Sequence, residues 1–148
     1  MRSPVTVSIG AGPESRTVGP ISQTDIVRFA GAGGDFNPLH HDPEFVRSSG
    51  FPGVIAMGQM HAGILAGLLS DWVGVEHIRE YEVRFVAPVF LGDILTASAL
   101  VTSVNSDGDG DGDGDGDGTT LATVELTLTR GDDTAIRGSA LVVAANDQ

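Results

Sequence analysis

The segment from residue 58 to residue 73 constrains the fold of this chain most, because Asp71 is its single charged side chain. Its large apolar residues recur at helical spacing, and small residues lie between them. A helix that is apolar or small around most of its circumference has no face suited to water, so we expect it to be buried nearly all round. The large apolar residues are Met60, Ile64, Leu65, Leu68, Leu69 and Trp72, and the small ones are Ala62, Gly63, Ala66 and Gly67.

After Gly74 the hydrophobic pattern changes from the helical period to the strand period. In four segments the apolar residues alternate with polar ones, as in strands with one buried face. Strands that follow a buried helix, with no helices between them, indicate an α+β fold in which an antiparallel sheet packs on that helix. The four segments are residues 78–85, 94–104, 121–129 and 135–143.

Two shorter helices are predicted before the buried one. Ser22 is followed three residues later by Asp25, a capping signal ahead of an apolar stretch, and this predicts a helix over residues 23–31. Asp42 and Pro43 read as the N-cap and first residue of a second helix, which reaches residue 48 before Gly50 ends it. We therefore assign Asp42 a structural role.

The charge and composition of the chain exclude several classes of function. The formal net charge is −12 and all eight basic residues are Arg, so no clustered positive surface for nucleic acid is expected. Cysteine is absent from the sequence, which excludes disulfides, thiolate nucleophiles and thiolate zinc sites and fits a reducing cytoplasm. The most apolar run, residues 64–73, is far shorter than the ~20 residues that cross a bilayer, so no membrane partner is expected.

A single domain over residues 1–148 is predicted, with one low-complexity segment inside it. Residues 107–118 repeat Asp-Gly and carry half of the net negative charge. This composition buries too little apolar area to offset chain entropy, which predicts a disordered hairpin loop. The repeat also resembles the opening of an EF-hand calcium loop, but no register that begins on Asp ends on the required Glu. Cation binding by this loop stays open, and we assign no metal or other cofactor.

Chemistry is indicated by residues 33–40, where a carboxylate and an imidazole lie five positions apart around a proline. The two glycines at the start allow a tight turn and a close approach to a ligand, and Pro38 directs the preceding residue toward extended geometry. Asp35 and His40 can therefore be directed at one point as an acid/base pair. The alternative is that Asp35 and Asn37 cap turns while His40 packs against its neighbours.

The sequence Gly-Gly-Asp-Phe-Asn-Pro-Leu-His at residues 33–40, with Phe29 before it, resembles the hydratase 2 motif of MaoC-like (R)-specific enoyl-thioester hydratases and dehydratases. The similarity continues through Ile-Ala-Met-Gly-Gln-Met at residues 55–60 and Tyr-Glu-Val-Arg-Phe at residues 81–85. Met57 stands where the family usually has His at the opening of its central helix. The resemblance implies a hot-dog fold, in which a curved antiparallel sheet wraps around a central buried helix.

This resemblance implies reversible hydration and dehydration of trans-2-enoyl and (R)-3-hydroxyacyl thioesters of coenzyme A or acyl carrier protein. The reaction needs a base toward water, a proton for the α-carbon and stabilisation of charge on the thioester oxygen. We assign Asp35 as the base and His40 as the residue that orients the water and relays the proton. The backbone N–H of Gly58, at the start of the buried helix, is the expected donor to the thioester oxygen. Asn37 joins Gly58 in the substrate-binding group, with fixing the loop as its main role.

Two other functions remain as alternatives. A hot-dog thioesterase would direct the activated water at the carbonyl carbon, and a noncatalytic subunit of a hetero-oligomeric dehydratase would bind an acyl thioester without reacting with it. The Asp35/His40 pair argues against the second, whereas Met57 keeps it open. Because a single curved sheet leaves an edge uncovered, and because the resemblance implies it, we expect a homodimer or heterodimer of hot-dog subunits.

His61 is a further polar residue of the buried helix, one turn after Gly58. A histidine on a mostly apolar helix more often packs in a core or at a subunit interface than transfers protons. We therefore expect a structural role for His61.

Overall fold

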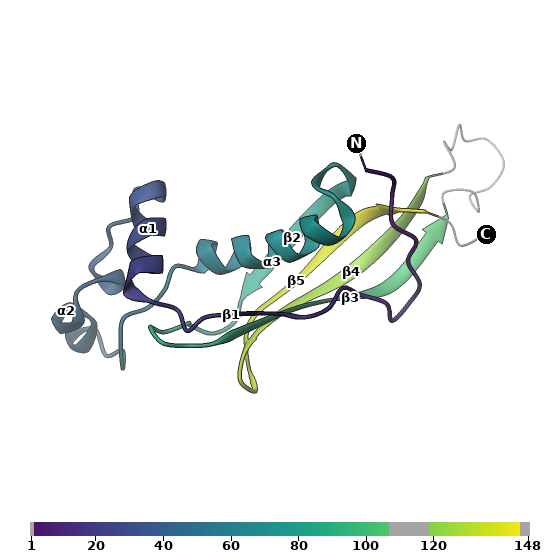
Figure 1. Cartoon of the computed structure of the whole chain (residues 1–148). Coiled ribbons are helices and arrows are strands. Elements are labelled where there is room, and N and C mark those ends of the chain that lie inside the picture. Colours follow the sequence, from purple (N-terminus) through teal and green to yellow (C-terminus); the bar gives the residue numbers. More distant parts are fainter. Residues whose placement is uncertain (1, 107–118, 146–148) are drawn as a thin grey trace.

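The computed structural model describes residues 2–106 and 119–145. Five strands form one sheet, helix α3 lies along one face of it, and two shorter helices lie beyond one end (Figure 1). The predicted α+β class is confirmed. The elements in chain order are β1 (Arg16–Val18), α1 (Gln23–Gly33), the 3₁₀ helix η1 (Pro38–His40), α2 (Pro43–Ser48), α3 (Gly58–Val73), the 3₁₀ helix η2 (Val75–His77), β2 (Ile78–Phe85), β3 (Leu95–Ser106), β4 (Thr120–Arg130) and β5 (Asp133–Ala144).

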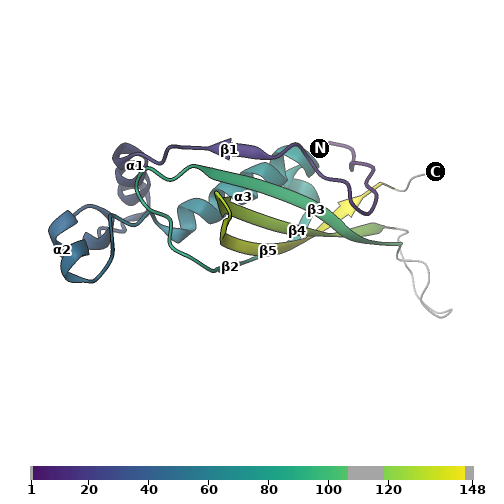
Figure 2. The same ribbon diagram turned by 90° about the horizontal axis from the view of Figure 1, so that it is seen from below.

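The strand order is β1-β3-β4-β5-β2, and every neighbouring pair is antiparallel (Figure 2). Strands β2 and β3 follow each other in the chain but lie apart in the sheet, so residues 86–94 cross one end of it. This crossing segment pairs with the chain just before α3. The N–H of Ala56 donates to the carbonyl of Val89 at 2.8 Å, and the N–H of Leu91 donates to that of Val54 at 3.0 Å. The start of α3 is thereby tied to the end of β2.

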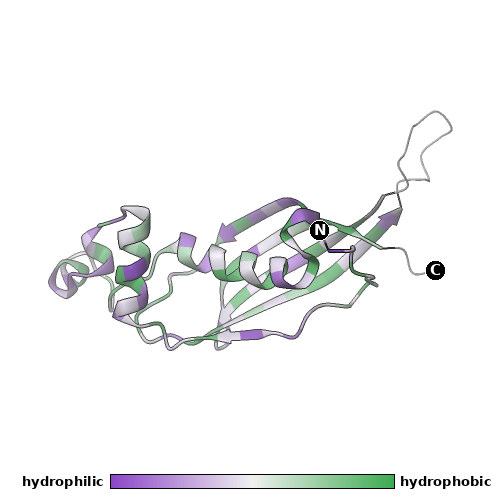
Figure 3. Ribbon diagram, turned by 45° about the horizontal axis from the view of Figure 1, so that its top comes forward, coloured by the Kyte–Doolittle hydropathy of each residue, from purple (hydrophilic) through white to green (hydrophobic). Residues whose placement is uncertain are grey.

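Helix α3 is held on the sheet by apolar burial. Leu65 and Leu69 of α3 and Leu126 and Leu128 of β4 are all fully buried. Buried and less buried residues alternate along β4, and Figure 3 shows hydrophobic and less hydrophobic residues alternating in the sheet. A polar contact also joins the two layers, since the hydroxyl of Tyr81 donates to the carbonyl of Ala62 at 2.7 Å. Among the described helices, none combines the length and apolar character needed to cross a membrane.

Residues 23–48, which we call the helical extension, lie beyond the sheet next to the first turn of α3 (Figures 1 and 2). Each of its helices begins with a side-chain cap. Ser22 and Asp25 form a capping box on α1, Asn37 caps η1, and Asp42 accepts from two backbone N–H groups of α2. The structural role predicted for Asp42 is confirmed.

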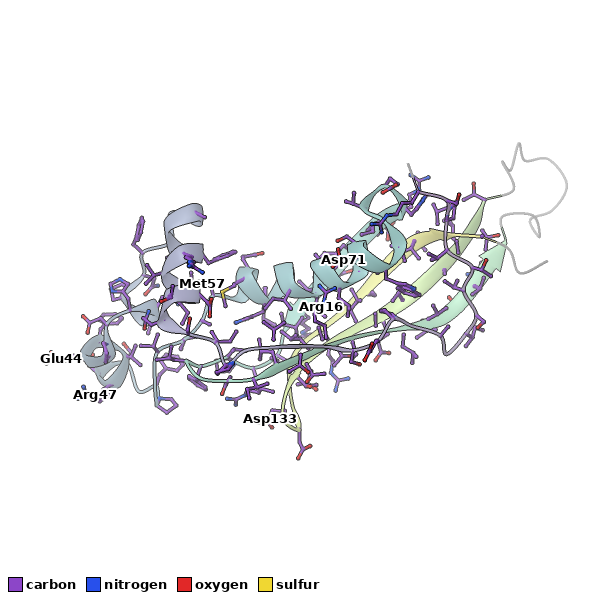
Figure 4. All side chains as sticks on the ribbon, in the orientation of Figure 1. Arg16, Glu44, Arg47, Met57, Asp71 and Asp133 are labelled. Carbon is purple, nitrogen blue, oxygen red and sulfur yellow. The ribbon has the colours of Figure 1, made fainter. Side chains whose placement is uncertain are left out.

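The structure differs from the sequence prediction at two places near the N-terminus. Helix α1 continues two residues past the predicted end, because Gly34 rather than Gly31 has the left-handed φ of +70° that terminates it. Strand β1 was not predicted, since three residues are too few to establish a period of two. It pairs with β3, and Arg16 forms an ion pair of 2.7 Å with Asp71 of α3 (Figure 4).

The Asp-Gly repeat at residues 107–118, predicted as a hairpin loop, lies outside the described residues. The strands on either side of it are paired through Ser106 and Thr120.

Gly138 of β5 allows β2 to approach closely. A methyl group at this position would lie 2.5 Å from the carbonyl oxygen of Glu82 and 3.0 Å from a methyl of Val83. The backbone oxygen cannot move without disturbing the β2–β5 ladder, so we expect Gly138→Ala to lower the free energy of unfolding by about 1–3 kcal/mol. Urea denaturation followed by circular dichroism measures this loss.

Gly31→Ala is the matched control, because nothing lies within 4 Å of the added methyl and the residue lies inside α1. The same exchange should there raise the free energy of unfolding by about 0.5–1 kcal/mol, since alanine loses less backbone entropy in a helix. A Gly138→Ala protein as stable as the original would contradict the close packing of β2 on β5.

Candidate active site

The loop that carries the predicted acid/base pair begins where α1 ends at Gly34. A carboxylate oxygen of Asp35 accepts from the N–H of Asn37 at 3.3 Å, and the side-chain oxygen of Asn37 accepts from the N–H of Leu39 at 3.0 Å. These two local turns, followed by Pro38 at the start of η1, fold the chain back on itself. Asn37 thus occupies its carboxamide oxygen in holding the loop.

The structure brings Asp35 and His40 together. Nε2 of His40 lies 3.5 Å from Oδ2 of Asp35, and the His40 side chain is 13% exposed against 51% for Asp35. On the other side of the ring, Nδ1 lies 2.6 Å from the carbonyl oxygen of Ile55. A carbonyl can only accept, which assigns the proton to Nδ1 and makes Nε2 of the neutral ring an acceptor facing Asp35. The pair is one partly buried imidazole and one carboxylate open to water.

His40 is fixed from three directions. Besides the ring contact with Ile55, its backbone carbonyl accepts from the side-chain amide of Gln23 at 3.0 Å. The carbonyl of the preceding Leu39 accepts from the N–H of Ile55 at 3.1 Å. The imidazole is therefore held between the start of α1 and the segment that leads into α3.

The N-cap of α3, Met57, lies two residues after Ile55. Its side chain makes no capping hydrogen bond, in contrast to the caps of α1 and α2. Within the described chain, no group accepts from the N–H of Gly58. The first N–H groups of a helix carry partial positive charge and favour an anion or a polarised oxygen. A Cβ at Gly58 would lie 2.9 Å from the ring of Phe85, so this ring packs directly over the first residue of α3.

An open cleft of about 280 Å³ lies at this helix start. Gly58 and His61 of α3 line it, and Ile55, the residue that holds His40, lines it as well. Asp35 and His40 are not among the described residues that line it, and the cleft is linked to this pair through Ile55, whose carbonyl holds the His40 ring. The remaining lining residues, all of them apolar or small, are Ala56, Phe85, Val86, Ala87, Pro88, Val89 and Ile136.

His61 has a more informative position than the sequence suggested. It is buried as expected, with 2% exposure, but it lines the cleft. Its Nε2 atom is buried and has no hydrogen-bond partner among the described residues. Burial lowers the pKa of His61 to about 4, although the charge of Asp93 opposes this shift, so the ring is neutral at physiological pH. Its spacing of three residues from Gly58 is the signal that could have placed it in the site.

Met57 occupies the N-cap position of α3 and is buried, with 3% exposure. Figure 4 shows its sulfur between α1 and the first turn of α3. A thioether accepts hydrogen bonds only weakly and carries no exchangeable proton. At the position where the resemblance implies a His, this chain therefore has a packing residue.

The burial of His61 makes stability depend on pH. An unfolded chain protonates this histidine near pH 6.5, whereas the folded chain does so near pH 4. Between these values the unfolded state binds more protons, so stability falls as the pH falls. From pH 6.5 to pH 5 we expect His61 to contribute a loss of about 2 kcal/mol in the free energy of unfolding.

Chemical denaturation of the original protein and of His61→Leu at both pH values isolates this contribution, because the other titrating groups cancel in the difference. His41→Ala serves as a control for the replacement of a histidine that is exposed rather than buried. Equal pH dependence in the original protein and His61→Leu would show that His61 is not titrating in this window.

The chain is similar in sequence to characterised proteins over most of its length. It matches the family described as "MaoC like domain" over residues 5–125. It is 32% identical, over 103 residues, to the (R)-specific enoyl-CoA hydratase of Aeromonas caviae, which covers 68% of this chain and 76% of that protein.

Solved structures agree with this similarity. The (R)-hydratase from A. caviae involved in PHA biosynthesis superposes with a TM-score of 0.77 at 27% identity, covering 94% of this chain and 98% of the other. The ChsH1–ChsH2 complex from Mycobacterium tuberculosis contains a chain that shares the fold with a TM-score of 0.76 at 21% identity, over 95% of this chain and all of the other. The hot-dog fold implied by the motif is confirmed. The chain belongs to the family of MaoC-like domains.

Proposed function

We propose that the protein is a hydro-lyase that adds water to trans-2-enoyl thioesters and removes it from (R)-3-hydroxyacyl thioesters of coenzyme A or acyl carrier protein. The observation that carries the proposal is the 3.5 Å approach of the Asp35 carboxylate to the His40 imidazole, whose ring is held by Ile55 at the wall of the cleft that Gly58 also lines. The relatives named hydratases support the same reaction class.

Asp35 and His40 hold the water in this proposal. A water molecule near Oδ2 of Asp35 and Nε2 of His40 can donate to both acceptors, and the 3.5 Å between these atoms leaves them free to share it. Attack on the β-carbon transfers the hydroxyl group there and leaves the water's proton with Asp35. His40 relays this proton to the α-carbon, so that one water adds across the double bond. The bond from Nδ1 to Ile55 keeps Nε2 directed at the reacting water.

Gly58 binds the thioester carbonyl in this proposal. As the β-carbon is attacked, negative charge develops on the thioester oxygen, and a preorganised donor in a sheltered site lowers the barrier. The N–H of Gly58 is such a donor, and the axis of α3 adds its positive end. Asn37 contributes by holding the loop rather than by touching substrate.

The test is incubation of the purified protein with crotonyl-CoA, following loss of enoyl absorbance together with thiol release. We expect the absorbance to fall without thiol release and the product to be (R)-3-hydroxybutyryl-CoA. Thiol release would instead identify a thioesterase. Absence of reaction on short and medium acyl chains, as CoA and as carrier-protein thioesters, would indicate a noncatalytic subunit.

In the same assay, Asp35→Ala and His40→Ala should each lower turnover by about 10²- to 10⁴-fold, because each removes a group that handles the proton. His41→Ala is the matched control, a neighbouring exposed histidine whose ring hydrogen-bonds the carbonyl of Phe36. Turnover near the original level in either of the first two variants would remove that residue from the mechanism.

We also propose that two hot-dog subunits pair through β2. This strand is an edge of the described sheet, and an edge strand readily pairs with another chain. Phe85 and Val86 at its end are 48% and 52% exposed and also line the cleft, so a second subunit would cover apolar surface next to the site.

Light scattering of the purified chain should therefore give about twice the 15.2 kDa mass of one chain. A mass of one chain would exclude a homodimer and would direct the search to a different partner subunit.

A further inference from the structure

The edge strand β2 presents backbone hydrogen-bonding groups on the side away from β5. Just past β2, the N–H of Val86 donates to the carbonyl of Ala135 at 2.8 Å, in continuation of the antiparallel β2–β5 register. Because the backbone groups of successive strand residues face opposite sides, the even-numbered residues of β2 from Glu80 onward direct theirs toward β5. The odd-numbered residues direct theirs toward the side where no described strand lies. They are Tyr81, Val83 and Phe85.

The charged side chains of β2 lie on the face of the sheet away from α3. Glu82 and Arg84 are exposed and alternate with Tyr81 and Val83. These two less exposed residues face α3, since the Tyr81 hydroxyl donates to the carbonyl of Ala62 and Val83 packs against the core. The ion pairs among the described residues include neither Glu82 nor Arg84.

Arg84 has an unfavourable neighbour within the single chain. It lies directly opposite Arg137 of β5, and both side chains are exposed. Like charges directly opposite each other destabilise a sheet. A carboxylate on a strand added at the β2 edge would offset this repulsion. Glu82, on the same face two residues earlier, is the carboxylate that a second copy of β2 brings.

Symmetry limits how two copies of β2 pair. In an antiparallel pair related by a two-fold axis, one residue meets its own copy, and residues equally far on either side of it meet each other. An axis at Tyr81 sets Glu80 against Glu82, and an axis at Glu82 or Arg84 sets that residue against itself. An axis at Val83 sets each Glu82 against an Arg84. This is the one register of β2 that opposes unlike charges without also opposing like ones.

We propose that two copies of this chain pair through β2 about an axis at Val83, so that Glu82 of each copy forms an ion pair with Arg84 of the other. This rests on the β2 pairing proposed above. The outward backbone groups of the odd-numbered residues then exchange hydrogen bonds between the copies. Glu82 and Arg84 occupy the non-hydrogen-bonded positions, where opposing Cα atoms are only about 4.5 Å apart and side chains are closest.

The same register covers one wall of each cleft. It sets Tyr81 of one copy opposite Phe85 of the other, on the face that carries α3. Phe85 lines the cleft, packs over Gly58 and is 48% exposed in the single chain. Aromatic pairs across two strands are favourable. Each copy therefore shields apolar surface at the cleft of the other.

Introduced cysteines report the register directly, because the sequence contains none. Directly opposite residues have Cα atoms about 4.5–5.5 Å apart, within the range that a disulfide bridges, whereas diagonal neighbours at about 7–8 Å are too far apart. We expect co-expressed Glu82→Cys and Arg84→Cys chains to form a cross-linked dimer under mild oxidation. Neither variant alone should cross-link.

A cross-link in either variant alone would place the axis at that residue and overturn the proposal. A co-expressed pair that scatters light as a dimer but does not cross-link would overturn it as well. The mass of a single chain would remove the β2 pairing itself. All of these measurements are independent of turnover, so a protein without hydratase activity would still decide the register.

Charge reversal tests the two ion pairs. Arg84→Glu should raise the dimer dissociation constant about tenfold in analytical ultracentrifugation, because both pairs become repulsive. Adding Glu82→Arg restores opposite charges and should return the constant to within about threefold of the original.

Arg79→Glu is the matched control, an equal charge change on an exposed residue of β2 that lies opposite Ala87 in this register. Its dissociation constant should stay within about twofold of the original. An Arg84→Glu dimer as tight as this control would overturn the proposal.

Discussion

The burial of α3 is the constraint on which the rest of this structure depends. A helix with small or apolar residues on most of its surface must be covered, and the sheet covers one side of it through residues such as Leu126 and Leu128. The helical extension and the crossing segment from β2 then meet at its first turn. Apolar packing cannot satisfy the free N–H groups at the start of α3, and these groups lie at an open cleft beside Ile55, the residue that holds the His40 ring.

Polar groups at this end of the molecule fall into two sets. Those that shape the loop are paired: Asn37 with Leu39, the ring of His40 with Ile55, and Gln23 with the carbonyl of His40. Those that face the cleft, the N–H of Gly58 and Nε2 of His61, have no partner within the described chain. Pairing makes the loop rigid, and the unpaired donors and acceptors are left for a ligand. The contrast between the sets locates the site better than any single residue does.

The sequence was sufficient to predict the elements that are marked by a local capping signal or by a long hydrophobic pattern. Helix α3 begins and ends where its apolar pattern does, α2 follows its Asp42–Pro43 signal, and the four long strands follow their alternation with shifts of one or two residues at their ends. The proximity of Asp35 and His40 could also be predicted, because one short loop carries both. By contrast, β1 exists only through its pairing with β3, a partner about eighty residues away, and the place of His61 in the cleft depends on the path of residues 86–89. Such long-range contacts have no local signature.

The paired ends of β3 and β4 that flank residues 107–118 lie far from the candidate site. These ends, Ser106 and Thr120, lie at the end of the sheet away from the helical extension (Figure 1). Lengthening the connection between two paired strand ends costs only about 0.6 kcal/mol for each doubling in length. The number of Asp-Gly units in the sequence between Ser106 and Thr120 can therefore change at little cost in stability, and the Asp35 loop, at the other end of the sheet, keeps its geometry. An insertion between these two strand ends is therefore a suitable way to attach a label or a second domain without disturbing the cleft.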